Sequence, residues 1–240
     1  MCASPGPRKC GIPGLIVVKP WRTQVNLDGP RYQLAGKVQR LVVLLHGLGA
    51  EGEALAEMAW EFTGRLPGTA VVAPNAPFAY DSAPSGYQWF SVEDDSTESY
   101  LKGAREAAPI IDAFLDRETA RYGVSDAQVA LIGFSQGAMM ALHTSLRRKS
   151  PIAMVGAYSG KLIAPALLKD EIKSRPPVLL IHGEADKAVP ASFQEAARKA
   201  IEANGVPVTT EIRKGLGHRI DERGVALGIE LLANAAEAIA

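Results

Sequence analysis

The sequence predicts a single α/β domain built on a mainly parallel sheet. Apolar runs of about five to seven residues alternate with stretches of helical spacing over about 200 residues, which is typical of strands joined by helical crossovers. Most of these runs are continuously hydrophobic, as expected for strands that are buried on both faces. No internal repeat, low-complexity segment or interdomain linker interrupts the alternation, so we expect three layers, helix, sheet and helix.

The elements follow in order from the N-terminus. Residues 1–14 are rich in Pro and Gly and predict a flexible tail, which leaves residues 15–240 as the domain. Within 15–36, short β-type runs flank an Asp28-Gly29 turn signal, so we expect an N-terminal β-hairpin. The buried strands are then expected in six runs: RLVVLLH (40–46), TAVVAP (69–74), QVALIGF (128–134), IAMVGAY (152–158), PVLLIHG (177–183) and VPVTTEIR (206–213).

Helices are expected between these runs. Within 101–123, apolar residues recur every three or four positions, Pro109 predicts a kink or the start of a second helix, and Gly123 predicts the end. Residues 221–240 predict a final amphipathic helix. Residues 74–99 do not fit the alternation, because they are rich in Pro, Ser and aromatic residues. A long irregular segment in a compact domain is usually functional.

Composition and charge narrow the class of protein. Of the 240 residues, 26 are Lys or Arg and 26 are Asp or Glu, so the formal net charge is zero. A neutral chain has no overall field that attracts nucleic acid or an anionic bilayer, and a small molecule or another protein is the expected partner. Two cysteines fit a reducing compartment such as the cytoplasm. No signal-type apolar segment and no membrane span is expected.

Gly133-Phe134-Ser135-Gln136-Gly137 lies where a predicted strand meets a predicted helix. In that context a G-x-S-x-G motif predicts a sharp turn that exposes the serine hydroxyl above the sheet. Larger side chains at the two glycines would clash. The alternative is an ordinary serine that caps the following helix.

A serine hydroxyl needs a base, and the chain has four histidines. His218 is the expected base because it follows the last strand in a glycine-rich loop with freedom to reach the serine. His46 and His182 each end a strand and are expected to bond nearby loops, and His143 lies within the helix after Ser135.

The base in turn needs an acid that orients it. Asp186 is the expected acid because it lies just past a strand end, with Glu184 as its competitor. Two backbone N–H groups, of Leu48 in the loop HGLGA and of Gln136, are expected to stabilise the oxyanion. No metal or cofactor is expected, since no metal-ligand spacing occurs and HGLGAEG lacks the full dinucleotide fingerprint.

Six motifs carry a resemblance to a known family. LLHGLGA, PNAPF, QWFS, GFSQGAMMAL, HGEADKAVP and GLGHRI occur in the order seen in the phospholipase/carboxylesterase family, small α/β-hydrolases without a cap domain that include bacterial carboxylesterases and acyl-protein thioesterases. The resemblance covers about residues 38–240. It implies Ser135, Asp186 and His218 as a catalytic triad, and Leu48 and Gln136 as oxyanion donors. A homodimer would also fit the family.

The resemblance also implies that the loop of Trp89 and Phe90 helps to wall the acyl pocket. The alternative for Trp89 is a tryptophan that only covers the core. Family members often have an aspartate after this aromatic pair, whereas Ser91 follows here, which leaves the substrate preference open.

The expected function is therefore that of a serine carboxylesterase that hydrolyses esters of short-to-medium chain length through an acyl-serine intermediate. The same machinery would serve an acyl-protein thioesterase or a lysophospholipase. A hydrolase fold that only binds ligands, without catalysis, is the alternative of another class.

Overall fold

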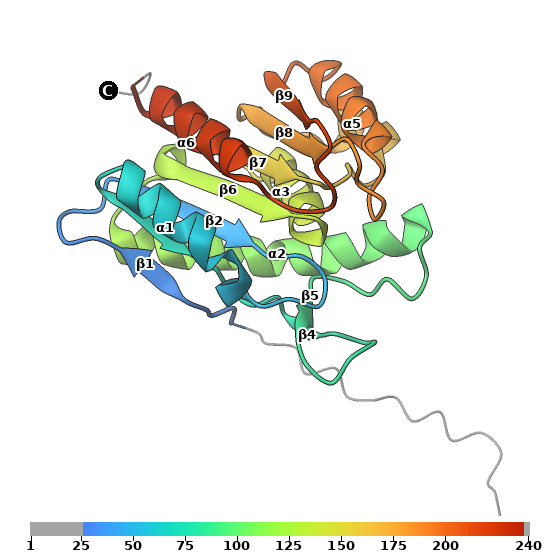
Figure 1. Ribbon diagram of the computed structural model, residues 1–240, viewed down its shortest axis with the longest axis horizontal. Coiled ribbons are helices and arrows are strands. Elements are labelled where there is room, and N and C mark those ends of the chain that lie inside the picture. Colours follow the sequence, from blue (N-terminus) through green and yellow to red (C-terminus); the bar gives the residue numbers. More distant parts are fainter. Residues whose placement is uncertain (1–25, 238–240) are drawn as a thin grey trace, which may run out of the picture.

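The computed structural model describes residues 26–237. The predicted flexible tail of residues 1–14 and the first arm of the predicted hairpin therefore lie outside the described residues. Every apolar run predicted as a strand forms one, and the fold is a mainly parallel sheet flanked by helices, as predicted (Figure 1).

Seven strands form the central sheet in the order β1-β3-β2-β6-β7-β8-β9. All neighbours are parallel except β1 and β3, which form an antiparallel pair at the N-terminal edge. Two short strands, β4 and β5, form a separate antiparallel pair. The strands are β1 Arg31–Gln33, β2 Arg40–Leu45, β3 Thr69–Val72, β4 Phe78–Ala79, β5 Tyr87–Gln88, β6 Val129–Phe134, β7 Met154–Tyr158, β8 Val178–Gly183 and β9 Val208–Arg213.

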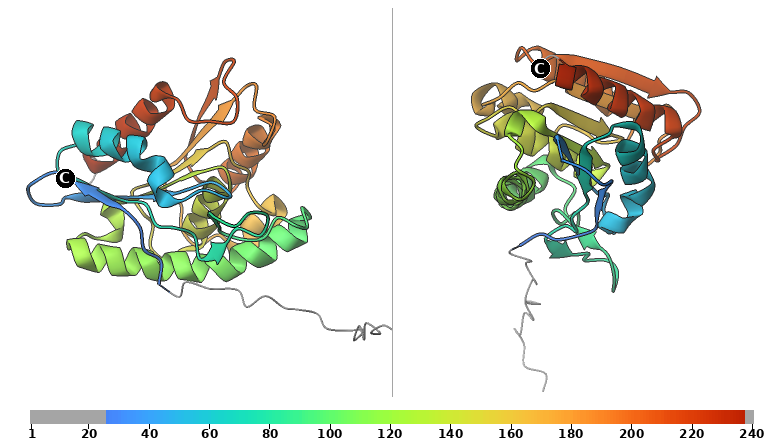
Figure 2. Two further views of the ribbon diagram at one scale, coloured as in Figure 1. Left: turned by 60° about the horizontal axis from the view of Figure 1, so that its bottom comes forward. Right: turned by 90° about the vertical axis from the view of Figure 1, so that its left-hand side faces the viewer.

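Helices cover both faces of this sheet. α1 and α6 lie side by side on one face, and α2, α3 and α5 cover the other (Figures 1 and 2). Each face has its own apolar core, and the buried strands contribute to both because their side chains alternate in direction. The helices are α1 Ala56–Arg65, α2 Thr97–Tyr122, α3 Gln136–Arg147, α4 Leu168–Glu171, α5 Ser192–Glu202 and α6 Glu222–Glu237, with single 3₁₀ turns η1 Gly52–Leu55, η2 Asp126–Gln128 and η3 Pro165–Leu167.

Of the two outcomes predicted for Pro109 in the long helix α2, the start of a second helix is wrong. No second helix starts there, and α2 continues from Thr97 to Tyr122. Pro109 faces solvent, where water can satisfy the carbonyl that loses its helical partner. The end of the helix is as predicted, because Gly123 adopts a left-handed conformation with φ of 65°.

Among residues 26–237, no helix has both the length and the apolar character that crossing a membrane requires.

Candidate active site

Ser135 stands at the turn between β6 and α3. Its backbone has φ of 54° and ψ of −116°, a conformation that residues other than glycine rarely adopt. The two flanking glycines make this turn possible, because a Cβ on Gly133 would lie 2.2 Å from backbone atoms of Gly137, and one on Gly137 would lie 2.0 Å from the carbonyl oxygen of Leu45. The tight turn lifts the hydroxyl of Ser135 above the carboxyl end of the sheet.

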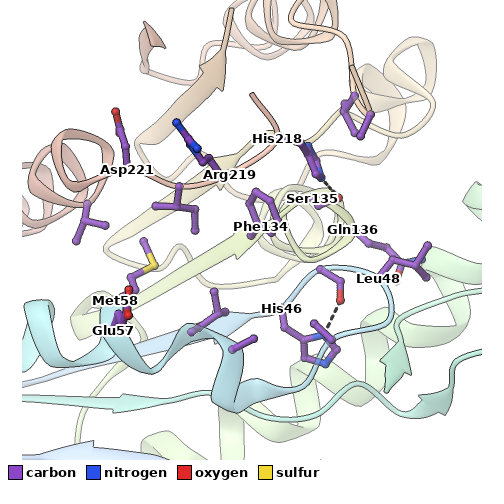
Figure 3. A pocket seen from close by; sticks show the side chains of 18 of the residues that line it. His46, Leu48, Glu57, Met58, Phe134, Ser135, Gln136, His218, Arg219 and Asp221 are labelled. Carbon is purple, nitrogen blue, oxygen red and sulfur yellow. Dashed lines mark hydrogen bonds between the residues drawn. The ribbon is translucent and has the colours of Figure 1, made fainter. Parts of the chain in front are cut away.

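The structure brings His218 and Asp186 to this hydroxyl. The Nε2 atom of His218 lies 3.0 Å from the Oγ atom of Ser135 (Figure 3). Its Nδ1 atom lies 2.7 Å from Oδ2 of Asp186. The three residues follow β6, β9 and β8, whose carboxyl ends lie at one edge of the sheet. The imidazole also packs against the ring of Phe134, with 4.8 Å between the ring centroids.

The carboxylate of Asp186 is buried and fixed by its own loop. Its Oδ1 accepts hydrogen bonds from the backbone N–H groups of Ala188 and Val189, both at 2.9 Å. Burial acts to raise the pKa of Asp186, but the hydrogen bonds from His218 and from these two N–H groups outweigh it and lower the pKa below its usual value. An ionised Asp186 accepts from Nδ1–H of His218, which leaves the Nε2 lone pair facing Ser135.

The competing acid and the strand-end histidines have other partners. Glu184 accepts a hydrogen bond from the backbone N–H of Gly215, away from the imidazole of His218. His182 donates from Nε2 to the carbonyl of Val189 at 2.8 Å and so supports the loop of Asp186.

His46 and His143 are buried and uncharged. His46 donates from Nδ1 to the carbonyl of Gly47 and accepts from the backbone N–H of Ala76, so it links two loops. Burial lowers the pKa of His46 to about 4. Burial, together with the charge of Arg147, lowers the pKa of His143 to about 3. Both imidazoles are therefore neutral near pH 7.

The backbone N–H groups of Leu48 and Gln136 donate to no acceptor within residues 26–237. Both residues line the cleft beside Ser135, on the same side of it in Figure 3. The loop that carries Leu48 is held from behind, since Gly49 donates to the carbonyl of Tyr87 at 2.9 Å. Two available donors next to a hydroxyl that lines the cleft can bind a developing negative charge.

The side chain of Gln136 has a contact that sequence reasoning missed. Its amide accepts from the backbone N–H of Trp89 at 2.9 Å and donates to the carbonyl of Phe90 at 2.7 Å. The indole N–H of Trp89 in turn donates to the carbonyl of His46 at 2.9 Å. The loops that carry the N–H groups of Leu48 and Gln136 are thus tied together through Trp89.

Trp89 and Phe90 therefore differ in position. Trp89 is fully buried in the core and does not line the cleft, because its ring packs beside His46 and its N–H is used internally. The prediction that Trp89 binds substrate is not supported by this placement, and its role as core cover fits better. Phe90 lines the cleft, as expected from the sequence.

The cleft around Ser135 has a volume of about 1660 Å³. Its walls come from the loop after β2, the segment 90–100, α1, the start of α3, the loop of Asp186 and the segment 213–225. Among residues 26–237, no three His, Cys, Asp or Glu side chains form a group that could hold a metal ion.

The chain is similar to proteins of a known family. The model of the phospholipase/carboxylesterase family matches residues 33–234. The esterase YpfH of Escherichia coli (strain K12) is 33% identical over 199 residues, which are 81% of this chain and 82% of that protein. The acyl-protein thioesterase 1 homolog 1 of Dictyostelium discoideum is 26% identical, over 74% of this chain and 82% of that protein. The crystal structure of esterase PE8 superposes with a TM-score of 0.83 at 41% identity, over 88% of this chain and 99% of that one.

The fold and the match over most of the chain define the class, which is the α/β-hydrolases. Within it, the chain belongs to the phospholipase/carboxylesterase family. The prediction of a serine hydrolase that acts on ester bonds is confirmed at the level of this family.

Proposed function

We propose that Ser135, His218 and Asp186 form the catalytic triad of a carboxylesterase. The observation that carries this proposal is the continuous chain from Oγ of Ser135 through the imidazole of His218 to the carboxylate of Asp186, at 3.0 and 2.7 Å. His218 takes the proton of Ser135 as the hydroxyl attacks the ester carbonyl, and Asp186 stabilises the imidazolium that forms.

The carbonyl oxygen becomes negatively charged during this attack. In the proposal, the N–H groups of Leu48 and Gln136, both of which line the cleft, donate to it. His218 then gives its proton to the departing alcohol, which leaves an acyl group on Ser135. A water molecule, activated by His218, releases the acid and restores the serine.

The proposed substrates are carboxylic esters of short-to-medium acyl chains. The support is an open cleft without an inserted cap domain within the described residues, with Phe90, Val92 and Met139 as an apolar wall. An acyl-protein thioesterase or a lysophospholipase is the alternative, since the same groups would act on a thioester or a lysophospholipid. A series of p-nitrophenyl esters with two to sixteen carbons, run beside the matching acyl thioesters, separates these substrates. A preference for sixteen carbons would contradict the proposal.

The proposed chemistry predicts the effect of removing the hydroxyl. Ser135→Ala should lower kcat for p-nitrophenyl butyrate by ~10³-fold or more, because the nucleophile is lost while the fold is retained. Release of p-nitrophenol measures the rate, and the melting temperature checks folding. Equal rates in the two proteins would contradict the assignment of Ser135.

A hydrolase fold that only binds ligands is separated by covalent labelling. A fluorophosphonate probe should label the wild type at Ser135 and leave Ser135→Ala unlabelled, because phosphonylation needs an activated serine. A folded wild type that stays unlabelled would favour the binding module.

A further inference from the structure

We describe the cleft around Ser135 as two arms, each defined by its lining residues. One arm, the acyl arm, is lined by Phe90, Val92 and Met139. The other, here called the α1–α6 arm, lies between α1 and the segment that follows His218 (Figure 3). A total volume of about 1660 Å³ exceeds the ~300–1,000 Å³ of an ordinary small-molecule pocket, so the cleft has room for both the acyl and the alcohol portion of an ester.

Resting on the proposed ester hydrolysis, we infer that the α1–α6 arm binds the alcohol portion of the substrate and selects esters with an extended, uncharged, apolar alcohol. The first argument is the direction of proton transfer. The alcohol oxygen must face Nε2 of His218 to receive its proton. The carbonyl oxygen must face Leu48 and Gln136, which lie on the other side of Ser135 from the arm (Figure 3). The alcohol therefore leaves along the wall to which His218 belongs.

The second argument is the apolar surface of the arm. Phe134 packs against the imidazole of His218, and from there the apolar lining continues along both walls. Leu55 and Met58 come from the α1 side, and Ile220 and Val225 come from the segment 218–225. Burial of methylene groups against such a surface is favourable, whereas an alcohol of one or two carbons would leave it in water.

The third argument is that most charged side chains along the arm are already paired with one another. Arg213 pairs with Asp221 at 2.9 Å, and Asp221 also accepts from the backbone N–H of Gly224 at the start of α6. Arg65 lies 3.7 Å from Glu61 in the same helix.

Further charges along the arm do not favour an anionic alcohol. Arg223 pairs with Glu230. Among the charged side chains that line the cleft, three form no ion pair within residues 26–237. They are Glu57, Glu222 and Arg219, two acidic and one basic. The arm thus presents no excess of unpaired positive charge, so a phosphate-bearing leaving group gains little there.

Two isomeric esters test the inference directly. Hexyl acetate and ethyl hexanoate have the same atoms, with the long chain on the alcohol side or on the acyl side. For the full-length wild type, kcat/KM for hexyl acetate should exceed that for ethyl acetate by ~10-fold or more, because four more methylene groups are at least partly buried in the arm. Acid release at constant pH measures all three rates.

Variants on opposite walls identify the arm. Ile220→Asn and Met58→Asn should each lower the ratio of kcat/KM for hexyl acetate over ethyl hexanoate by ~5-fold or more. Val92→Asn, in the acyl arm, should raise it. Ile212→Asn is the matched control, because Ile212 is 45% exposed and outside the cleft, and it should leave the ratio unchanged. Ile220 is half-buried, so its variant remains informative if the buried Met58 does not tolerate asparagine.

The outcomes separate this inference from the proposed function. If Ser135→Ala hydrolyses the esters as fast as the wild type, the proposed function fails. The assignment of the arm is overturned if the wild type hydrolyses the esters but its kcat/KM is no higher for hexyl acetate than for ethyl acetate. It is also overturned if Ile220→Asn lowers the turnover of ethyl hexanoate instead of that of hexyl acetate. Higher turnover of a lysophospholipid than of hexyl acetate would also overturn the inference that the arm selects an uncharged alcohol.

Discussion

At the scale of single residues, the site depends on buried polar side chains outside the proposed triad. Gln136 uses both ends of its amide to hold the backbone at Trp89 and Phe90, and Trp89 holds His46. Because the available N–H groups belong to residues 48 and 136, these contacts set the distance between them. A glutamine next to a proposed nucleophile gives no sequence signal for this role, since its partners are 46 and 47 residues away.

Gln136→Leu tests this role. The variant keeps the backbone N–H but loses both side-chain bonds, so we expect kcat for p-nitrophenyl butyrate to fall by ~10- to 100-fold with little change in KM. Gln194→Leu is the matched control, because Gln194 is also buried and donates to the carbonyls of Leu180 and Glu211. Gln194→Leu should lower the melting temperature about as much as Gln136→Leu does, but it should keep the kcat of the wild type. Equal losses of kcat in both variants would mean that the role of Gln136 is only structural.

His143 predicts a dependence of stability on pH. Its pKa is about 3 in the folded protein and about 6.5 in the unfolded chain, so the unfolded chain binds more protons between these values. Acidification therefore destabilises the fold, and this histidine alone should cost about 2 kcal/mol at pH 5 relative to pH 7. Its Nδ1 is also buried without a hydrogen-bond partner among the described residues.

His143→Leu should remove this cost. Urea unfolding at pH 7 and pH 5 should show the variant gaining about 2 kcal/mol on the wild type as the pH falls. His46, whose pKa is about 4, keeps its own acid-dependent cost in both proteins. The same difference between variant and wild type at both pH values would contradict a buried neutral His143.

At the scale of elements, the turn between β6 and α3 depends on the absence of side chains. Sequence patterns predicted this turn and the strands around it, because continuous apolar runs and a G-x-S-x-G motif are local signals. The path of residues 74–99 could not be predicted. It depends on contacts across the fold, such as those of Trp89 with His46 and Gln136, which no periodicity encodes. Pro109 was likewise ambiguous, because its tolerance depends on which face of α2 meets solvent.

Gly137→Ala tests the turn. Its Cβ would meet the backbone of Leu45 and His46 at 2.0 to 2.6 Å, which no side-chain movement relieves, so we expect a loss of ~3 kcal/mol or more and little activity. Gly64→Ala in α1 is the control, because nothing lies within 4 Å of its Cβ, and it should stabilise the helix by ~0.5–1 kcal/mol. Chemical denaturation measures both, and a stable, active Gly137→Ala would contradict the geometry of the turn.

At the scale of the whole molecule, one sheet joins everything described. The cores on its two faces share strands β2, β3, β6, β7 and β8, and the loops of Ser135, Asp186 and His218 all leave its carboxyl edge. The sequence predicts residues 15–240 as one domain, and we propose that its described part, residues 26–237, behaves as a single cooperative unit.

Urea unfolding followed by three signals tests this unit. Far-ultraviolet circular dichroism, tryptophan fluorescence and esterase activity should change with coincident midpoints, because neither core persists without the shared strands. Activity lost well before the other two signals, at an enzyme concentration where refolding restores it, would indicate that the loops open separately from the sheet.

The position of α1 and α6 beside the cleft has a consequence for the evolution of substrate specificity in such proteins. α1 and α6 contribute walls to the cleft, while the proposed reacting groups all come from loops at strand ends. If the α1–α6 arm binds the alcohol as proposed, substitutions in these helices would change which esters are accepted while the proposed reacting groups stay intact. Homologues that diverge from one ancestor would then change in substrate specificity faster than in reaction mechanism.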